Sequence, residues 1–133
     1  MKKNLALIFA VLLMMGSILQ VNASERSVGS LFGSTIEING EAGGIRVTCS
    51  TKSSTTADII GVKNVVLQEK VNGTWKNINI SGGAETNSDS FLGSALYTGA
   101  VKGRTYRAYC THYATYGGTT KTLDNEVGEL VYN

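Results

Sequence analysis

The segment 104–118, RTYRAYCTHYATYGG, carries the most reactive side chains of the chain. It contains the only histidine, His112, one of the two cysteines, Cys110, and four of the six tyrosines. Residues two apart lie on the same face of a β-strand, so Cys110 and His112 could share a nucleophilic site or a metal site. A structural zinc site takes four ligands, whereas one histidine and two cysteines supply at most three. A catalytic pair also lacks a second histidine or a suitably placed acid. We therefore expect no metal, no cofactor and no catalytic residue.

Motifs of the common enzyme classes are absent from the sequence. There is no Gly-x-Ser-x-Gly, no His-Glu-x-x-His and no phosphate-binding loop. Scattered acidic residues could pair in space as glycosidase carboxylates do, but nothing in the sequence brings two of them together. The expectation is a non-enzymatic protein, and a small extracellular hydrolase is the weakest alternative.

The first 23 residues have the pattern of a cleaved signal peptide. Lys2 and Lys3 precede an apolar run (LALIFAVLLMMGSIL), and Val21-Asn22-Ala23 supplies the small residues that a signal peptidase reads. The run is short for a membrane span and no stop-transfer cluster follows it. We expect a signal peptide over 1–23, a flexible segment over 24–33 and one domain over 34–133, secreted to the extracellular space without a membrane anchor.

Removal of the signal peptide leaves a chain with almost no net charge. The 12 basic residues include Lys2 and Lys3, so ten remain to balance the ten acidic residues. A basic surface for nucleic acid therefore has no support, and no nucleic-acid partner is expected. Nothing in the sequence specifies an oligomeric state.

Short alternating segments separated by turn residues predict an all-β domain. Loops are expected over 52–56 and 81–90. About seven short strands are typical of an immunoglobulin- or fibronectin-like antiparallel β-sandwich. The expected strands are 35–39, 45–50, 62–70, 75–80, 91–97, 105–115 and 120–132, the last broken near 124–125. The expected core consists of Ile36, Ile38, Ile45, Val47, Val65, Leu67, Trp75, Ile78, Tyr106, Ala108 and Leu130.

Cys49 and Cys110 are expected to form a structural disulfide, because two cysteines in a secreted chain most simply pair. Each has the apolar parity of its strand, and in an immunoglobulin-like sandwich these strands face each other across the core. Closing a loop of about sixty residues would contribute on the order of 4 kcal/mol. His112 is expected at the end of the inner row of its strand, bonded to a loop carbonyl.

The opposite parity of the same strand predicts a binding face. Arg107, Tyr109 and Tyr113 should point out of the sandwich, and Tyr116 could extend the face at the turn. Tyrosine and arginine supply large contact area at low entropic cost, as binding hot spots require. The same residue types are also ordinary outer-face residues with cross-strand neighbours. An extracellular protein or glycan is the expected partner.

Three stretches resemble a family of small secreted proteins from Gram-positive, Clostridia-like bacteria, a domain of unknown function. They are IGVKNVVLQEKVNGTW, YTGAVKGRTYRAYCTHYATYGGTTKT and NEVGELVYN. The resemblance implies secretion and a β-sandwich, and it brings no activity, cofactor or catalytic residue. Gly103–Tyr106 is also similar to the fibronectin type III strand that begins with a corner tyrosine. The expected function is a secreted binding module of a Gram-positive bacterium, and the alternative is a bacteriocin-like antagonistic protein.

Overall fold

The structure, a computed structural model, describes residues 28–133. The expected signal peptide and the first residues of the flexible segment lie outside the described residues. The described part is all-β and contains no helix. Its strands are β1 (Thr35–Glu41), β2 (Gly44–Val71), β3 (Thr74–Ile80), β4 (Gly83–Tyr97), β5 (Thr105–Tyr116) and β6 (Thr119–Val131).

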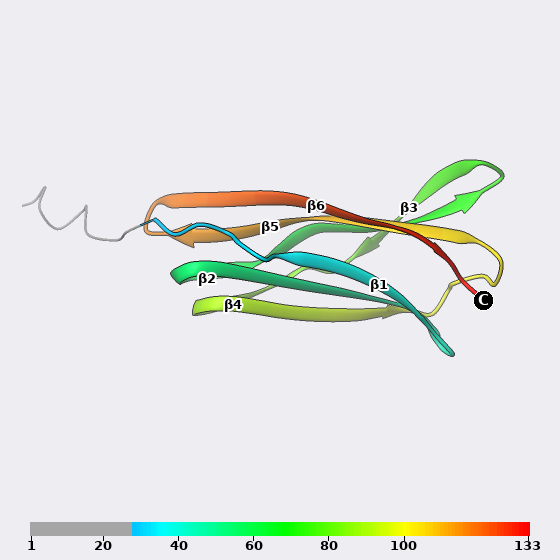
Figure 1. Cartoon of the computed structure of the whole chain (residues 1–133), viewed down its shortest axis with the longest axis horizontal. Coiled ribbons are helices and arrows are strands. Elements are labelled where there is room, and N and C mark those ends of the chain that lie inside the picture. The colour runs from blue at the N-terminus through cyan, green and yellow to red at the C-terminus, as the bar shows by residue number, and fades with distance from the viewer. Residues whose placement is uncertain (1–27) are drawn as a thin grey trace, which may run out of the picture.

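All six strands belong to one antiparallel sheet organised around β2. The first part of β2 pairs with β1 and β4, its middle with β4 and β5, and its last part with β3 and β5. Each strand has two edges, so β1 and β5 share one edge of β2 while β4 and β3 share the other. β6 extends the sheet beyond β5. The sheet curls, and Figure 1 shows β5 and β6 along one side and the first part of β2 with β4 along the other.

The great length of β2 is the main departure from the expected architecture. Its 28 residues join the two expected strands 45–50 and 62–70 through the expected loop 52–56. Much of the expected loop 81–90 likewise belongs to β4. Register shifts between Lys52 and Ala57 and between Lys63 and Val66 interrupt the ladders of β2 with β4 and β5, and such irregularities bend a strand. The described chain therefore has six strands in one curled sheet, where about seven strands in a sandwich were expected.

The polar stretch of β2 around residues 51–53 can form a buried strand because its inward-pointing hydroxyl groups have hydrogen-bond partners. Thr51 and Ser53 are buried, and their hydroxyls bond the side chains of His112 and Tyr116 on β5. Hydrogen bonding removes most of the cost of burying these groups. Alternate residues of this stretch are therefore buried, although their polar side chains hide the alternation in the sequence.

The main core lies inside the curl and confirms most of the expected core residues. Trp75 was the wrong choice: it is half-buried and lies on the outer face, because the inner row of β3 is formed by Ile78 and Ile80. Ile78 and Leu130 are partly buried and pack against the core. Those fully confirmed are Ile36, Ile38, Ile45, Val47, Val65, Leu67, Tyr106 and Ala108.

Side chains connect the two strands that approach each other across the open side of the curl. Asn125 Nδ2 on β6 donates to the carbonyl of Ser34 at 3.0 Å, next to the start of β1. At the other end, the buried Tyr132 donates its hydroxyl to the carbonyl of Glu41 at 2.8 Å. These bonds hold β1 and β6 together over the core.

Candidate binding groove and buried thiol network

The alternation of β5 sorts its side chains into the two rows that the sequence predicts. The inner row Tyr106, Ala108, Cys110, His112 and Ala114 is buried throughout. Arg107, Tyr109 and Tyr113 lie in the other row. Tyr116 was wrongly placed at the binding face: it is only 2% exposed, and its hydroxyl bonds Ser53. Its even number continues the inner row, so strand parity alone excludes it from the outer face.

Neighbouring strands place further side chains beside Arg107 and Tyr109. Gln68 of β2 is the register partner of Arg107, and Val66 is that of Tyr109. On β6, Glu126 lies opposite Tyr109 and Gly128 lies opposite Arg107. The outer face therefore has an aromatic and cationic centre on β5 with an acidic border on β6.

Arg107 is held in place by two contacts that the sequence analysis missed. Its Nε donates to Gln68 Oε1 at 2.6 Å, and its Cζ lies 4.0 Å from the centroid of the Trp75 ring. Gln68 Nε2 in turn donates to Asn77 Oδ1 at 2.7 Å, and the Lys70 Nζ lies 5.5 Å from the same indole ring. Stacking on tryptophan and a fixed Nε bond restrict the guanidinium before any ligand arrives.

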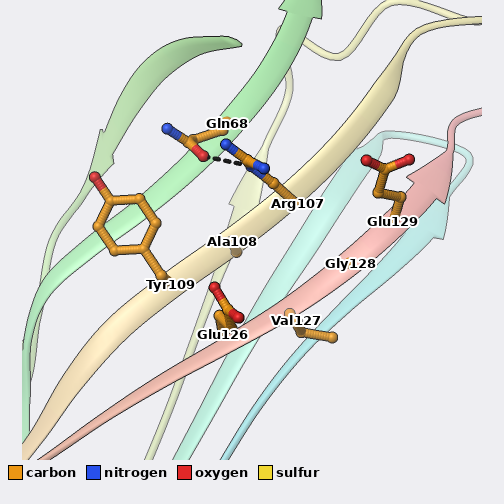
Figure 2. A pocket seen from close by; sticks show the side chains of 8 residues that line it. All are labelled: Gln68, Arg107, Ala108, Tyr109, Glu126, Val127, Gly128 and Glu129. Atoms are coloured by element: carbon orange, nitrogen blue, oxygen red, sulfur yellow. Dashed lines mark hydrogen bonds between the residues drawn. The ribbon is translucent and has the colours of Figure 1, made fainter.

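A groove of about 660 Å³ lies along this part of the outer face, between β2 and β6. Figure 2 shows Arg107 joined to Gln68, with the Tyr109 ring on one side of the pair and the Glu129 carboxylate of β6 on the other. Gly128 leaves the room that Arg107 needs, because a Cβ there would lie 2.6 Å from the Arg107 Cβ. The lining residues are Gln68, Arg107, Ala108, Tyr109, Glu126, Val127, Gly128 and Glu129.

Tyr109 also lines a second groove. The second groove, of about 580 Å³, also contains Glu126 and continues to Asn64, Thr111 and Asp124. Tyr109 is 37% exposed, which makes it the exposed aromatic ring of both grooves. Tyr113 lies on the same face but lines neither groove, and the Lys63 Nζ lies 5.4 Å from its ring. The structure therefore brings two of the four predicted face residues, Arg107 and Tyr109, into one site.

A second candidate site is buried inside the curl, where Cys49 of the first part of β2 meets Cys110 of β5. Both belong to the main core cluster, and both are free thiols. The predicted disulfide is therefore not formed in this structure, although the prediction that the two residues share the core is confirmed. The two thiols interact without being covalently joined, because each shifts the pKa of the other.

His112 joins this thiol pair through a hydrogen-bond chain. The Thr51 hydroxyl lies 3.1 Å from the carbonyl oxygen of Gly61 and 2.7 Å from His112 Nδ1. When its single hydrogen goes to Gly61, Nδ1 of His112 carries a proton and Nε2 is an acceptor; when it goes to Nδ1, Nε2 carries the proton. Nε2 lies 3.5 Å from the Cys110 Sγ. The expected bond from His112 to a loop carbonyl was wrong, because the Thr51 hydroxyl of a strand takes that place.

The two thiols and the imidazole have different proton affinities. Burial lowers the pKa of His112, which keeps the ring neutral. Interaction with Cys110 lowers the pKa of the Cys49 thiol, whereas interaction with Cys49, together with burial, raises the pKa of Cys110.

Besides the grooves and the buried thiol network, a polar cluster around Tyr106 has a structural role. The Tyr106 hydroxyl donates to Glu69 Oε2 at 2.6 Å and accepts from the backbone N–H of Val101 at 2.8 Å. Arg104 pairs with the other oxygen of Glu69 at 2.8 Å. Burial and the bond to Glu69 raise the pKa of Tyr106 to about 12. This cluster fixes the turn that leads into β5, and so fixes which residues of β5 reach the outer face.

Residues 28–133 contain neither a cluster of metal-ligating side chains nor a membrane-spanning helix. No group of three or more histidine, cysteine, aspartate or glutamate side chains there is arranged to hold a metal ion. In the same range, no helix is long and apolar enough to cross a membrane.

Comparison with known proteins leaves the site to be interpreted from its own chemistry. The chain matches no protein-family model, no curated protein and no solved structure. The resemblance to small secreted proteins of Gram-positive bacteria therefore stays a prediction.

Proposed function

We propose that the protein is a secreted, non-enzymatic binding module whose ligand lies across Tyr109 in the outer-face grooves. The observation that carries this proposal is the position of Tyr109, an exposed ring shared by two adjoining grooves and flanked by Arg107 and Glu126. An aromatic ring with a few polar groups around it is the usual composition of a recognition site.

The site is also preorganised, which favours binding. Arg107 is held by Gln68 and Trp75, and the backbone beneath it is a paired sheet on both sides of β5. Because these groups are already ordered, their ordering on ligand binding would cost little affinity. The guanidinium offers donors to the ligand, and the Glu126 and Glu129 carboxylates offer acceptors.

The proposed partner is an extracellular glycan or protein. A sugar ring or a flat peptide side chain can stack on Tyr109, while hydroxyl or amide groups meet the charged border. The Glu126 and Glu129 carboxylates on β6 would repel the phosphates of a nucleic acid, so no nucleic-acid partner is proposed.

We also propose that the exported protein begins after Ala23 and carries an oxidised Cys49–Cys110 pair. The basic and apolar pattern of residues 1–23 supports the first statement. The position of both cysteines in one core cluster supports the second. Protein recovered from the medium of an expressing Gram-positive host should start at Ser24 by N-terminal sequencing.

Binding is tested by displaying the secreted protein on an array of glycans and bacterial cell-surface components. The wild type should bind at least one component, and Tyr109→Ser should weaken that binding by about tenfold or more. Tyr113→Ser is the matched control, because it removes an equal ring from the same row outside both grooves. Equal loss in both variants, or no loss in either, would overturn the assignment of the site.

A further inference from the structure

The Cys49–Cys110 pair has one accessible side. Cys49 lines an apolar pocket of about 250 Å³ together with Val62, Val65, Ile80 and Phe91. This pocket adjoins residues 81–83, where the chain passes from β3 to β4. A small molecule in the pocket would contact the Cys49 side, although the residue itself is only 4% exposed.

Cys110 does not have an equivalent approach. It borders the second outer groove, but its Sγ points the other way, toward the Nε2 of the inner-row residue His112. Cys110 is not among the residues that line the apolar pocket. The two thiols differ in access as well as in chemistry.

The Cys110 Sγ lies 3.5 Å from His112 Nε2. In the Nδ1–H form of His112, in which the Thr51 hydroxyl donates to the Gly61 carbonyl, Nε2 can accept the Cys110 proton. A neutral imidazole next to a thiol is the arrangement that removes a thiol proton.

We propose that these residues form a dithiol–disulfide exchange site, in which Cys49 is the entering thiol, Cys110 the resolving thiol and His112 the base that serves Cys110. This inference rests on the proposed oxidation of the pair and adds the order of its steps. The oxidant is a disulfide of a low-molecular-weight thiol, RSSR, small enough to enter the apolar pocket.

The first step takes place at Cys49. Its thiol loses a proton to solvent, and the thiolate attacks one sulfur of RSSR. A Cys49–S–S–R bond forms, the S–S bond of RSSR breaks, and RS⁻ leaves and takes up a proton. Cys49 is favoured for this step because it lines the pocket that RSSR enters.

The second step closes the disulfide. Cys110 gives its proton to His112 Nε2, and its thiolate attacks the Cys49 sulfur of the mixed disulfide. The Cys49–Cys110 bond forms as the second RS⁻ leaves and is protonated from His112. In total, the two thiols lose two electrons and two protons, and RSSR becomes two RSH.

Few other charged side chains lie next to Cys110 and His112. From β2 it meets Cys49 and Thr51, and from β6 Asp124 acts on Cys110 by raising its pKa. The register partner of His112 on β6 is the apolar Leu123. Within this surrounding, His112 is the basic group in contact with the Cys110 Sγ.

The order is tested with reduced protein and bis(2-hydroxyethyl) disulfide as the probe, by acid quenching and mass spectrometry of peptides. The wild type should show an early adduct on Cys49 that converts to the internal disulfide. Cys110→Ser should accumulate the Cys49 adduct, and Cys49→Ser should form a Cys110 adduct at least about tenfold more slowly. The wild-type time course needs no variant, so it decides the order even where a substitution impairs folding.

The role of His112 is tested by His112→Gln. The rate of the first adduct should be nearly unchanged, while closure slows and its rate rises about tenfold per pH unit between pH 7 and 8.5, as expected for a thiol without a base. The wild-type closure rate should be nearly flat over this range. An early adduct on Cys110, or identical pH profiles, would overturn the inference. If the wild type never forms the internal disulfide, the proposed oxidation fails as well.

Discussion

The guanidinium of Arg107 lies over the indole ring of Trp75, with its Cζ 4.0 Å from the ring centroid. The two residues belong to β5 and β3, which are separated by β2, so the Arg107 side chain reaches across a whole strand. Gln68 of β2, the strand between them, accepts a hydrogen bond from Arg107 Nε. Three strands therefore fix the one cation that lines the larger groove.

Trp75→Leu should loosen Arg107 and weaken ligand binding more than it weakens the fold. A stack of this kind is worth about 0.5–1 kcal/mol at an exposed site, and leucine retains part of the apolar contact. We expect about 1 kcal/mol of lost unfolding free energy, measured by urea denaturation, with a several-fold loss of affinity. Lys70→Ala removes the more distant cation above the same ring and serves as control. If both variants bind as tightly as the wild type, the stack does not prepare the site.

Tyr106→Phe should destabilise the protein through its effect on Glu69. The substitution removes the hydroxyl that donates to this buried carboxylate and accepts from Val101. A buried charged group that loses a partner costs about 1.5–3 kcal/mol. Chemical denaturation measures the loss. Tyr113→Phe, which removes a hydroxyl from the outer row, should change stability by less than about 0.5 kcal/mol.

The all-β character and the two faces of β5 could be predicted from the sequence because burial there coincides with hydrophobic alternation. The single curled sheet could not. In the middle of β2 the inward residues Thr51 and Ser53 are hydroxylic, so a buried strand looks like a polar loop. Their burial depends on His112 and Tyr116, which lie about sixty residues away in the sequence and become partners only in the folded sheet.

Only part of the candidate site could be predicted, for a similar reason. Alternation identifies Arg107 and Tyr109, but the groove also needs β6, and the sequence does not specify which strand pairs with β5. Two errors were avoidable. Strand parity places Tyr116 in the inner row, and counting back from Ile78 places Trp75 on the outer face.

Stability should fall on acidification below pH 6.5 because of His112. Burial lowers its pKa in the folded state below the ordinary value of 6.5, so the unfolded chain binds a proton that the folded chain does not. The contribution is fully present above pH 6.5 and is lost as the pH falls through the folded-state pKa. Unfolding free energies of the wild type and His112→Gln, measured from pH 5 to 7.5, should differ in slope. Parallel curves would show that His112 does not titrate differently on folding.

Gly128→Ala should damage the larger groove directly. The new Cβ would lie 2.6 Å from the Arg107 Cβ and 3.3 Å from its Cα, and neither atom belongs to the flexible end of the side chain. The strand must shift, which should cost about 1–3 kcal/mol of stability and weaken ligand binding. Gly118→Ala is the matched control, because its Cβ would meet no atom within 4 Å. Thermal unfolding and array binding should therefore separate the two alanine variants, and equal behaviour would mean that the packing of Gly128 against Arg107 does not shape the site.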